Sequence, residues 1–215
     1  IQIDPESVQA YLKLGETSLK LGDPREALKA YSRVVNLDPE NMEAQFKLAT
    51  FYLLGKKDEE AKEKIELILK QEPENTKALF LLASILTLEK KPDEAEKTYR
   101  KILEVDSKDI RAYIGLSRIL MLQGRIADAE RVLDQAIEAD PKSIRAKMAK
   151  FYHLVAVRQL EKAEQHILQI ITDNPSVSDL KIALGDFYLL KRDLPKAEAA
   201  YLDAVQTNPE SVNAY

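Results

Sequence analysis

The chain has 215 residues with a formal net charge of −4, and its acidic and basic residues are interleaved. Hydrophobic residues make up 45% and charged residues 32%, which is typical of a folded protein and too apolar for a disordered one. The mixed charge argues against nucleic acid as a partner, and the lack of cysteine excludes disulfide bonds and thiolate chemistry.

A helix-breaking pair recurs along the chain at intervals of 34 residues or a multiple of 34. Its copies are Asp4-Pro5, Asp38-Pro39, Glu72-Pro73, Asp140-Pro141, Asn174-Pro175 and Asn208-Pro209. At the one missing place in the series, Ser107 follows Asp106. Because proline cannot continue a helix and restricts the residue before it, each pair predicts the end of a helix.

This interval predicts a single array of repeats over residues 1–215. Full repeats are expected at 8–41, 42–75, 76–109, 110–143, 144–177 and 178–211, with partial repeats at 1–7 and 212–215. Since the chain starts and stops inside a repeat, we expect it to be a piece of a longer array. Position 20 of the repeat is always alanine: Ala27, Ala61, Ala95, Ala129, Ala163 and Ala197.

Two amphipathic helices are expected in each repeat, because apolar residues recur at intervals of three and four over positions 3–14 and 20–28. In the first repeat, Asp23 can cap the second helix, with Pro24 at its first position and Glu26 completing a capping box. Residues 91–95 and 193–199 repeat this arrangement. A single pair of such helices cannot bury its apolar faces, so we expect the pairs to stack on one another.

The repeat at 144–177 departs from the pattern. Lys147 and Lys150 stand at positions 4 and 7, which are otherwise expected to be apolar, and Phe151 stands at the small position 8. We expect either a first helix that is rotated or shifted by a residue or two, or two lysines that bury their stems and keep their ammonium groups in water.

The repeats resemble the tetratricopeptide repeat (TPR) family along the whole chain. The family series is present as Tyr11, Leu14, Gly15, Ala27, Tyr31 and Pro39, and again as Leu184, Gly185, Tyr188, Ala197, Tyr201 and Pro209. Ser18 stands where the family has a tyrosine. The resemblance implies an all-α, right-handed solenoid of stacked antiparallel helix pairs, with the first helices lining a concave surface.

On that surface the resemblance places positions 2, 5, 9 and 12. Position 5 is apolar in every repeat: Leu12, Phe46, Phe80, Ile114, Met148 and Ile182. Positions 2 and 9 carry basic residues in the middle of the array: Lys77, Arg111, Arg118 and Arg145. We predict a groove that binds a peptide or helical segment of a partner protein, with apolar anchors beside central acidic residues. The alternative is that the apolar residues only pack neighbouring first helices together.

No catalytic or phosphate-binding motif is present, so the sequence predicts a binding module that is not an enzyme and needs no metal or cofactor. The two histidines are interpreted as a packed core residue, His153, and a surface residue, His166.

A second interpretation is a structural, self-assembling or spacer module of a larger bacterial protein, with end-to-end association of the array. The longest apolar run, 78–86, is too short to insert into a membrane, and the first residues lack a targeting signal. We therefore expect a soluble segment of the bacterial cytoplasm or cell envelope, without deciding between them.

Overall fold

The computed structural model describes residues 6–208, and in this range the chain forms twelve α-helices and no strand. The first helices of the repeats are α1 (Val8–Lys20), α3 (Met42–Leu54), α5 (Thr76–Leu88), α7 (Ile110–Leu122), α9 (Ile144–Ala156) and α11 (Ser178–Leu190). The second helices are α2 (Pro24–Leu37), α4 (Asp58–Gln71), α6 (Pro92–Val105), α8 (Ile126–Ala139), α10 (Leu160–Asp173) and α12 (Leu194–Thr207). None of the described helices is both long and apolar enough to cross a membrane.

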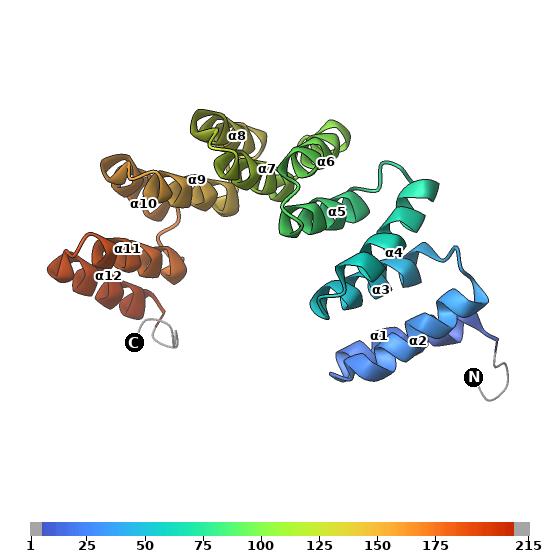
Figure 1. The fold of residues 1–215 in the computed structure, drawn as a ribbon. Coiled ribbons are helices and arrows are strands. Elements are labelled where there is room, and N and C mark those ends of the chain that lie inside the picture. The colour runs from blue at the N-terminus through green and yellow to red at the C-terminus, as the bar shows by residue number, and fades with distance from the viewer. Residues whose placement is uncertain (1–5, 209–215) are drawn as a thin grey trace. The chain divides into compact units, whose positions relative to one another are not determined.

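The helices group into two compact units, which meet in sequence between Gly124 and Arg125. The first unit contains α1 to α7 and the second contains α8 to α12 (Figure 1). Within each unit, every helix packs against the next one along the chain, so that antiparallel pairs stack on one another. This confirms the predicted all-α solenoid of helix pairs. The single array over 1–215 stays a prediction, and its ends at 1–5 and 209–215 lie outside the described residues.

Polar residues stand at the start of most first helices and directly after the end of the second helices. In the first five repeats, the N-cap side chain of the first helix accepts a hydrogen bond from a backbone amide. These N-cap residues are Ser7, Asn41, Asn75, Asp109 and Ser143. The second helices end directly before the first residue of a recurrent pair. For example, α2 ends at Leu37 before Asp38-Pro39, and α4 ends at Gln71 before Glu72-Pro73. The predicted role of the Asp-Pro pairs as helix ends is therefore confirmed in the described range.

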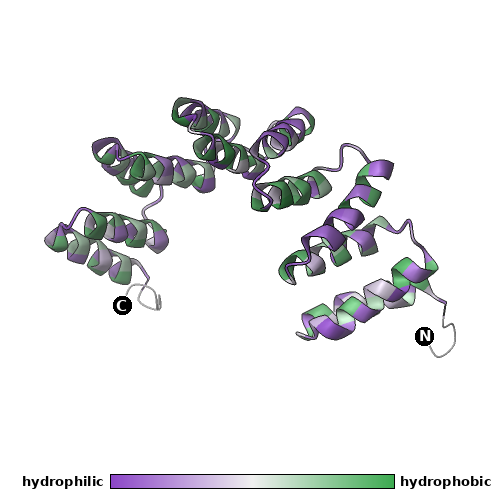
Figure 2. Cartoon of the chain, viewed as in Figure 1, coloured by the Kyte–Doolittle hydropathy of each residue, from purple (hydrophilic) through white to green (hydrophobic). Residues whose placement is uncertain are grey.

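Each helix pair buries its apolar side, as the alternation of hydrophobic and hydrophilic residues around the helices in Figure 2 illustrates. The alanines at position 20 are 0–1% exposed in all six repeats, because a larger side chain there would separate the packed helices. Position 24 is tyrosine in three repeats and aliphatic in the other three, and each of the tyrosines lies against a glycine. Tyr31 lies against Gly15, Tyr99 against Gly115, and Tyr201 against Gly185.

The turn inside each repeat contains one residue with positive φ. Glycine occupies this place at Gly22 and Gly124, with φ of 75° and 76°. In the other four repeats it is a basic residue: Lys56, Lys90, Arg158 and Arg192, with φ of 56° to 62°. A side chain with a Cβ atom is strained in this conformation, so these four turns store backbone strain that glycine would relieve.

Replacing Lys90 by glycine is therefore expected to raise the free energy of unfolding by about 0.5–1 kcal/mol, the strain relieved minus the extra entropy of the unfolded chain. Urea unfolding followed by circular dichroism measures the change. The matched reverse substitution, Gly22→Ala, is expected to lower the stability. A destabilised Lys90→Gly variant would show that the lysine contributes contacts that outweigh its strain.

The first helix of the fifth repeat is in register with the others. It begins at Ile144, which is 34 residues after the start of α7 at Ile110. Its buried residues Ala146, Phe151, His153 and Leu154 stand at the same repeat positions as the buried Ala112, Ser117, Ile119 and Leu120 of α7. The predicted rotation or shift of this helix is therefore wrong.

The two lysines of this helix instead bury most of their length, since the side chains of Lys147 and Lys150 are each 20% exposed. The Lys147 ammonium lies 3.1 Å from a carboxylate oxygen of Asp173 on α10, and the Lys150 ammonium pairs with Asp134 on α8. Both carboxylates are partly exposed, so the charges lie near the surface. The aliphatic parts of both lysine side chains are therefore buried, as the second of the two sequence-based alternatives expected, and their ammonium groups form ion pairs with carboxylates.

Candidate functional site

The apolar residues predicted at repeat position 5 lie on the first helices, and most of them are half-buried. Phe46, Phe80 and Ile114 of the first unit are partly exposed, as are Met148 and Ile182 of the second. Half-buried apolar side chains keep a surface that a partner can cover.

Leu12 departs from this pattern, because it is only 6% exposed. It belongs to a core cluster with Tyr31 and Val34 of α2 and Leu48 of α3. The prediction that Leu12 lines an open groove is therefore wrong. Its side chain packs the first helix pair against the second. This is the alternative role, packing between helices, that the sequence left open for all the position 5 residues.

The predicted basic residues Lys77, Arg111, Arg118 and Arg145 are all exposed. Arg111 is already bound, since its Nη2 and Nε atoms donate hydrogen bonds of 2.6 Å and 3.1 Å to the carboxylate of Asp109. Burial would raise the pKa of Asp109, but hydrogen bonds from the Arg111 guanidinium and from backbone amides outweigh it and lower the pKa. The charge of Arg111 is thus largely compensated within the protein.

The Arg111 guanidinium also lies 5.2 Å from the centre of the Phe80 ring, in a cation–π contact. This contact, together with the edge-on packing of Phe80 on Tyr99 at 6.0 Å, explains why Phe80 is half-buried. Arg111 is therefore better described as a residue that positions Phe80 than as a free charge for a ligand. In the first unit, Lys77 and Arg118 are the predicted groove cations without an ion pair among residues 6–208.

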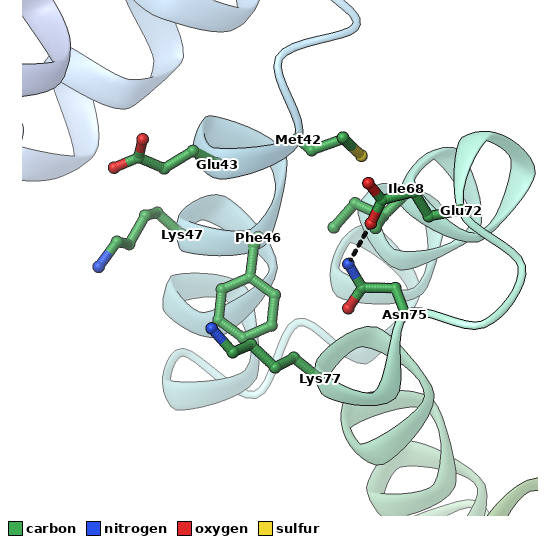
Figure 3. A pocket seen from close by; sticks show the side chains of 8 residues that line it. All are labelled: Met42, Glu43, Phe46, Lys47, Ile68, Glu72, Asn75 and Lys77. Atoms are coloured by element: carbon green, nitrogen blue, oxygen red, sulfur yellow. Dashed lines mark hydrogen bonds between the residues drawn. The ribbon is translucent and has the colours of Figure 1, made fainter. Parts of the chain in front are cut away.

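A pocket of about 400 Å³ opens between α3, α4 and the start of α5 in the first unit. Its lining residues are Met42, Glu43, Phe46, Lys47, Ile68, Glu72, Asn75 and Lys77 (Figure 3). Phe46 and Lys77 are predicted groove residues, and the structure brings them together here. Figure 3 shows Phe46 projecting from α3 toward the first turn of α5, which carries Lys77.

The pocket combines an apolar floor with a charged rim. Met42, Phe46 and Ile68 supply the apolar side chains, and Glu43 and Lys47 stand on the exposed side of α3 (Figure 3). At the other side Asn75 caps α5 through a 3.0 Å hydrogen bond from the Ala78 amide, and its own amide donates to Glu72 at 2.7 Å. These two hydrogen bonds fix this wall of the pocket, because both the amide oxygen and the amide nitrogen of Asn75 are engaged.

Several pocket residues were not predicted from the sequence, among them Met42, Lys47, Ile68 and Asn75. They stand at positions 1, 6, 27 and 34, which the family resemblance does not place on the concave surface. One signal was available for Met42, because position 1 is also apolar at Val8, Ile110 and Ile144.

In the second unit, one face of α9 carries Arg145, Met148 and Tyr152. Tyr152 is 58% exposed, although its ring centre lies only 5.1 Å from that of Phe151. The three residues stand at repeat positions 2, 5 and 9, so their spacing places them on one side of the helix. Tyr152 is thus an exposed aromatic residue at a groove position, although it was not among the predicted binding residues.

The two histidines of the fifth repeat differ in burial, since His153 lies in the core and His166 is half-buried. His153 is 6% exposed, as expected for a packed residue, and its Nε2 atom has no hydrogen-bond partner among the described residues. The prediction of a surface location for His166 is wrong, because this side chain is half-buried with its Nε2 atom 3.0 Å from the carbonyl oxygen of Lys147. Between residues 6 and 208, no His, Asp and Glu side chains gather in a group that could hold a metal ion.

Three family models match the chain. A tetratricopeptide repeat model matches residues 86–150, a second one matches residues 148–212, and the model "Cytochrome c-type biogenesis protein H TPR domain" matches residues 1–113. No curated protein matches the sequence.

Solved structures share the fold at low sequence identity. A tetratricopeptide repeat protein from Parabacteroides merdae has a TM-score of 0.76 and 20% identity, over 98% of this chain and 82% of that one. PilW, described as a widely conserved type IV pilus biogenesis factor, has a TM-score of 0.74 and 17% identity, over 96% of each chain. YrrB, described as a TPR protein with an unusual peptide-binding site, has a TM-score of 0.55 and 17% identity, over 87% of this chain and 97% of that one.

Proposed function

Because the chain belongs to the tetratricopeptide repeat family, we propose that it is a protein-interaction scaffold whose first helices hold a segment of a partner protein. The observation that carries the proposal is the pocket beside Phe46, where an apolar floor is open to solvent between two first helices. A peptide-binding site is also part of the description of YrrB, which has the same fold.

The side chains of the site define the chemistry of the segment that would bind. An apolar side chain of the partner fits the floor formed by Met42, Phe46 and Ile68. Acidic residues of the partner fit beside Lys77 and Arg118, which are exposed and have no ion pair in the described range. Burying a side chain the size of leucine or phenylalanine contributes about 1.5–3 kcal/mol before the costs of ordering the segment.

The proposed role is non-catalytic. The side chains that line the pocket include no serine, cysteine or histidine that could act as a nucleophile or proton shuttle. The match to a cytochrome c-type biogenesis protein and the likeness to a pilus biogenesis factor support a scaffold that acts in biogenesis in the bacterial cell envelope.

Replacing Phe46 and Phe80 together by alanine is expected to weaken binding of such a segment at least tenfold, since each change removes a contact worth roughly 1–2 kcal/mol. The probe is a set of peptides selected from a random displayed library against the unaltered chain, and isothermal titration calorimetry measures their affinity. The selected peptides should share an apolar residue flanked by aspartate or glutamate.

The matched control is Leu67→Ala, which truncates an exposed apolar side chain on the second helix α4, and circular dichroism verifies that each variant is folded. Peptides that bind the folded Phe46→Ala/Phe80→Ala variant as tightly as the unaltered chain would contradict the assignment of the groove. Exchanging Lys77 for glutamate tests the charge, and should select against acidic peptides.

A further inference from the structure

The turn between α11 and α12 presents a cluster of exposed leucines, of which Leu190 and Leu194 stand outside the groove positions of the repeat. Leu189 and Leu190 at the end of α11 are 47% and 48% exposed, and Leu194 at the start of α12 is 64% exposed. Three large apolar side chains within six residues of one turn are an unusual surface for a protein in water, and they mark this turn as a site of interaction.

The charges around these leucines leave one cation uncompensated. Lys191 and Lys196 both pair with Glu164 of α10, at 2.5 Å and 3.5 Å, and Lys196 also lies 3.6 Å from Asp193. Both nearby carboxylates are therefore neutralised by lysines. Arg192 is exposed at the tip of the turn, and its guanidinium has no hydrogen-bond or ion-pair partner in the described part of the chain.

Arg192 also occupies a backbone conformation that does not favour it, with φ of 61°. The same turn position is glycine at Gly22 and Gly124, so the fold accepts the residue that removes the strain. Strain of this kind persists where the side chain has a use that outweighs it. An arginine without a partner inside the protein points to a partner outside it.

The first unit repeats this arrangement in two of its turns. Leu54 is 79% exposed and is followed by Lys56, and Leu88 is 67% exposed and is followed by Lys90. Both lysines have positive φ and no ion pair among residues 6–208. The combination of an exposed leucine and an unpaired cation two residues later is thus a property of the turns inside the repeats, and it is most developed between α11 and α12.

We propose that the α11–α12 turn docks on the surface of an anionic lipid bilayer. The leucines enter the boundary between headgroups and acyl chains, while Arg192 binds the lipid phosphates. A bilayer offers an apolar layer next to a negatively charged one, and this turn presents exposed leucines next to an unpaired arginine side chain. The turn is the tip of a helix pair, so it suits a surface that yields around it, whereas a folded protein needs a matching cavity. Such docking is peripheral and requires no membrane-spanning helix.

The test is co-sedimentation of the full chain with vesicles of phosphatidylcholine, with and without one-third phosphatidylglycerol. The chain is expected to bind the anionic vesicles and to bind them less at high salt. Arg192→Gly should weaken binding about fivefold, the effect of one basic residue near an anionic surface. Leu190→Ser/Leu194→Ser should weaken it on the order of tenfold through lost apolar burial.

Reduced vesicle binding by Arg192→Gly would not be caused by unfolding, because glycine relieves the backbone strain of the turn. The melting temperature of this variant should be equal to that of the unaltered chain or higher. The matched control is Lys142→Gln/Leu202→Ser, which removes one exposed unpaired lysine and one exposed leucine elsewhere in the second unit. The proposal is overturned if the unaltered chain fails to bind anionic vesicles, as expected if the turn docks on an acidic protein instead. It is equally overturned if the control loses as much binding as the turn variants.

Discussion

Replacing Gly15 by alanine is expected to lower the free energy of unfolding by about 1–3 kcal/mol, the usual cost of forcing an extra methyl group into a packed core. A Cβ atom at Gly15 would lie 2.6 Å from the Tyr31 ring, which is closer than non-bonded carbon atoms approach one another. Tyr31 is 0% exposed, so its ring has no free space into which it can move. Urea or thermal unfolding measures the loss.

The repeats themselves indicate how the loss can be repaired. In the second repeat, alanine stands at the place of Gly15 and isoleucine at the place of Tyr31, and both Ala49 and Ile65 are fully buried. In a double-mutant cycle, Tyr31→Ile should therefore cost much less in the Gly15→Ala background than in the unaltered chain. Its hydroxyl is no loss, because the buried Tyr31 oxygen has no hydrogen-bond partner among the described residues.

Gly185→Ala is the matched comparison. The added methyl group would also meet a tyrosine ring, at 2.4 Å from Tyr201, but Tyr201 is partly exposed and can turn outward. A smaller loss is expected there, with part of it from breaking the 2.7 Å hydrogen bond of the Tyr201 hydroxyl to Asp186. Strictly additive effects of Gly15→Ala and Tyr31→Ile would contradict the proposed steric conflict.

Acidification from pH 7 to pH 5 is expected to destabilise the fifth repeat, because full burial of His153 and partial burial of His166 disfavour their protonated forms. Burial lowers the pKa of His153 and of His166 below the ordinary value of 6.5. Below pH 6.5 the unfolded chain then binds more protons than the folded one. Stability is therefore retained above pH 6.5 and lost as the pH falls from 6.5 toward the folded pKa.

The charges that face the histidines do not reverse this result. Around His153, Glu130 and Asp134 of α8 raise the pKa while Lys150 of α9 lowers it, and burial remains the largest effect. Around His166, the carbonyl of Lys147 and the Asp134 carboxylate raise the pKa, whereas the ammonium groups of Lys147 and Lys150 lower it. Carboxylates such as Glu164, with pKa values below the ordinary 4.5, lose their contribution only at lower pH.

His153→Phe separates the contribution of this side chain. Phenylalanine stands at the same position at Phe51 and Phe187, so the repeat accommodates it. The variant should gain about 1–3 kcal/mol at neutral pH, since an unpaired buried nitrogen is removed, and it should lose part of the pH dependence between 7 and 5. Urea unfolding at several pH values measures both effects. The same slope in the unaltered chain and in a His153→Phe/His166→Gln double variant would show that the histidines are not its source.

The helices of this protein are largely a property of its local sequence. Pro39 and its equivalents end helices whatever the neighbours are, and caps such as Asn41 lie within three residues of the amides that they accept from. The repetition of these local signals every 34 residues, with an alanine at each close contact, then requires helix pairs of equal length that stack. For these reasons the helix positions and the stacked fold were accessible without coordinates, whereas the register of α9 was predicted wrongly, because Lys147 and Lys150 interrupt its apolar pattern.

The candidate site was accessible only in part. Phe46 and Lys77 were predicted because they recur at groove positions, but the pocket between them also needs Met42, Ile68 and Asn75 from three different segments. Their approach depends on how tightly α3, α4 and α5 pack, which no spacing along one helix encodes.

The amino-acid sequence by itself thus determined where each helix begins and ends, which face of it is apolar, and that the helices stack as pairs, because these properties depend on neighbours within one or two turns. The tertiary structure alone decided that Leu12 is covered, that the Lys150 charge is paired with Asp134, and that the half-buried His166 contacts the Lys147 carbonyl. Each of these outcomes depends on a contact between two helices, and a repeat pattern does not specify which atoms meet across such an interface.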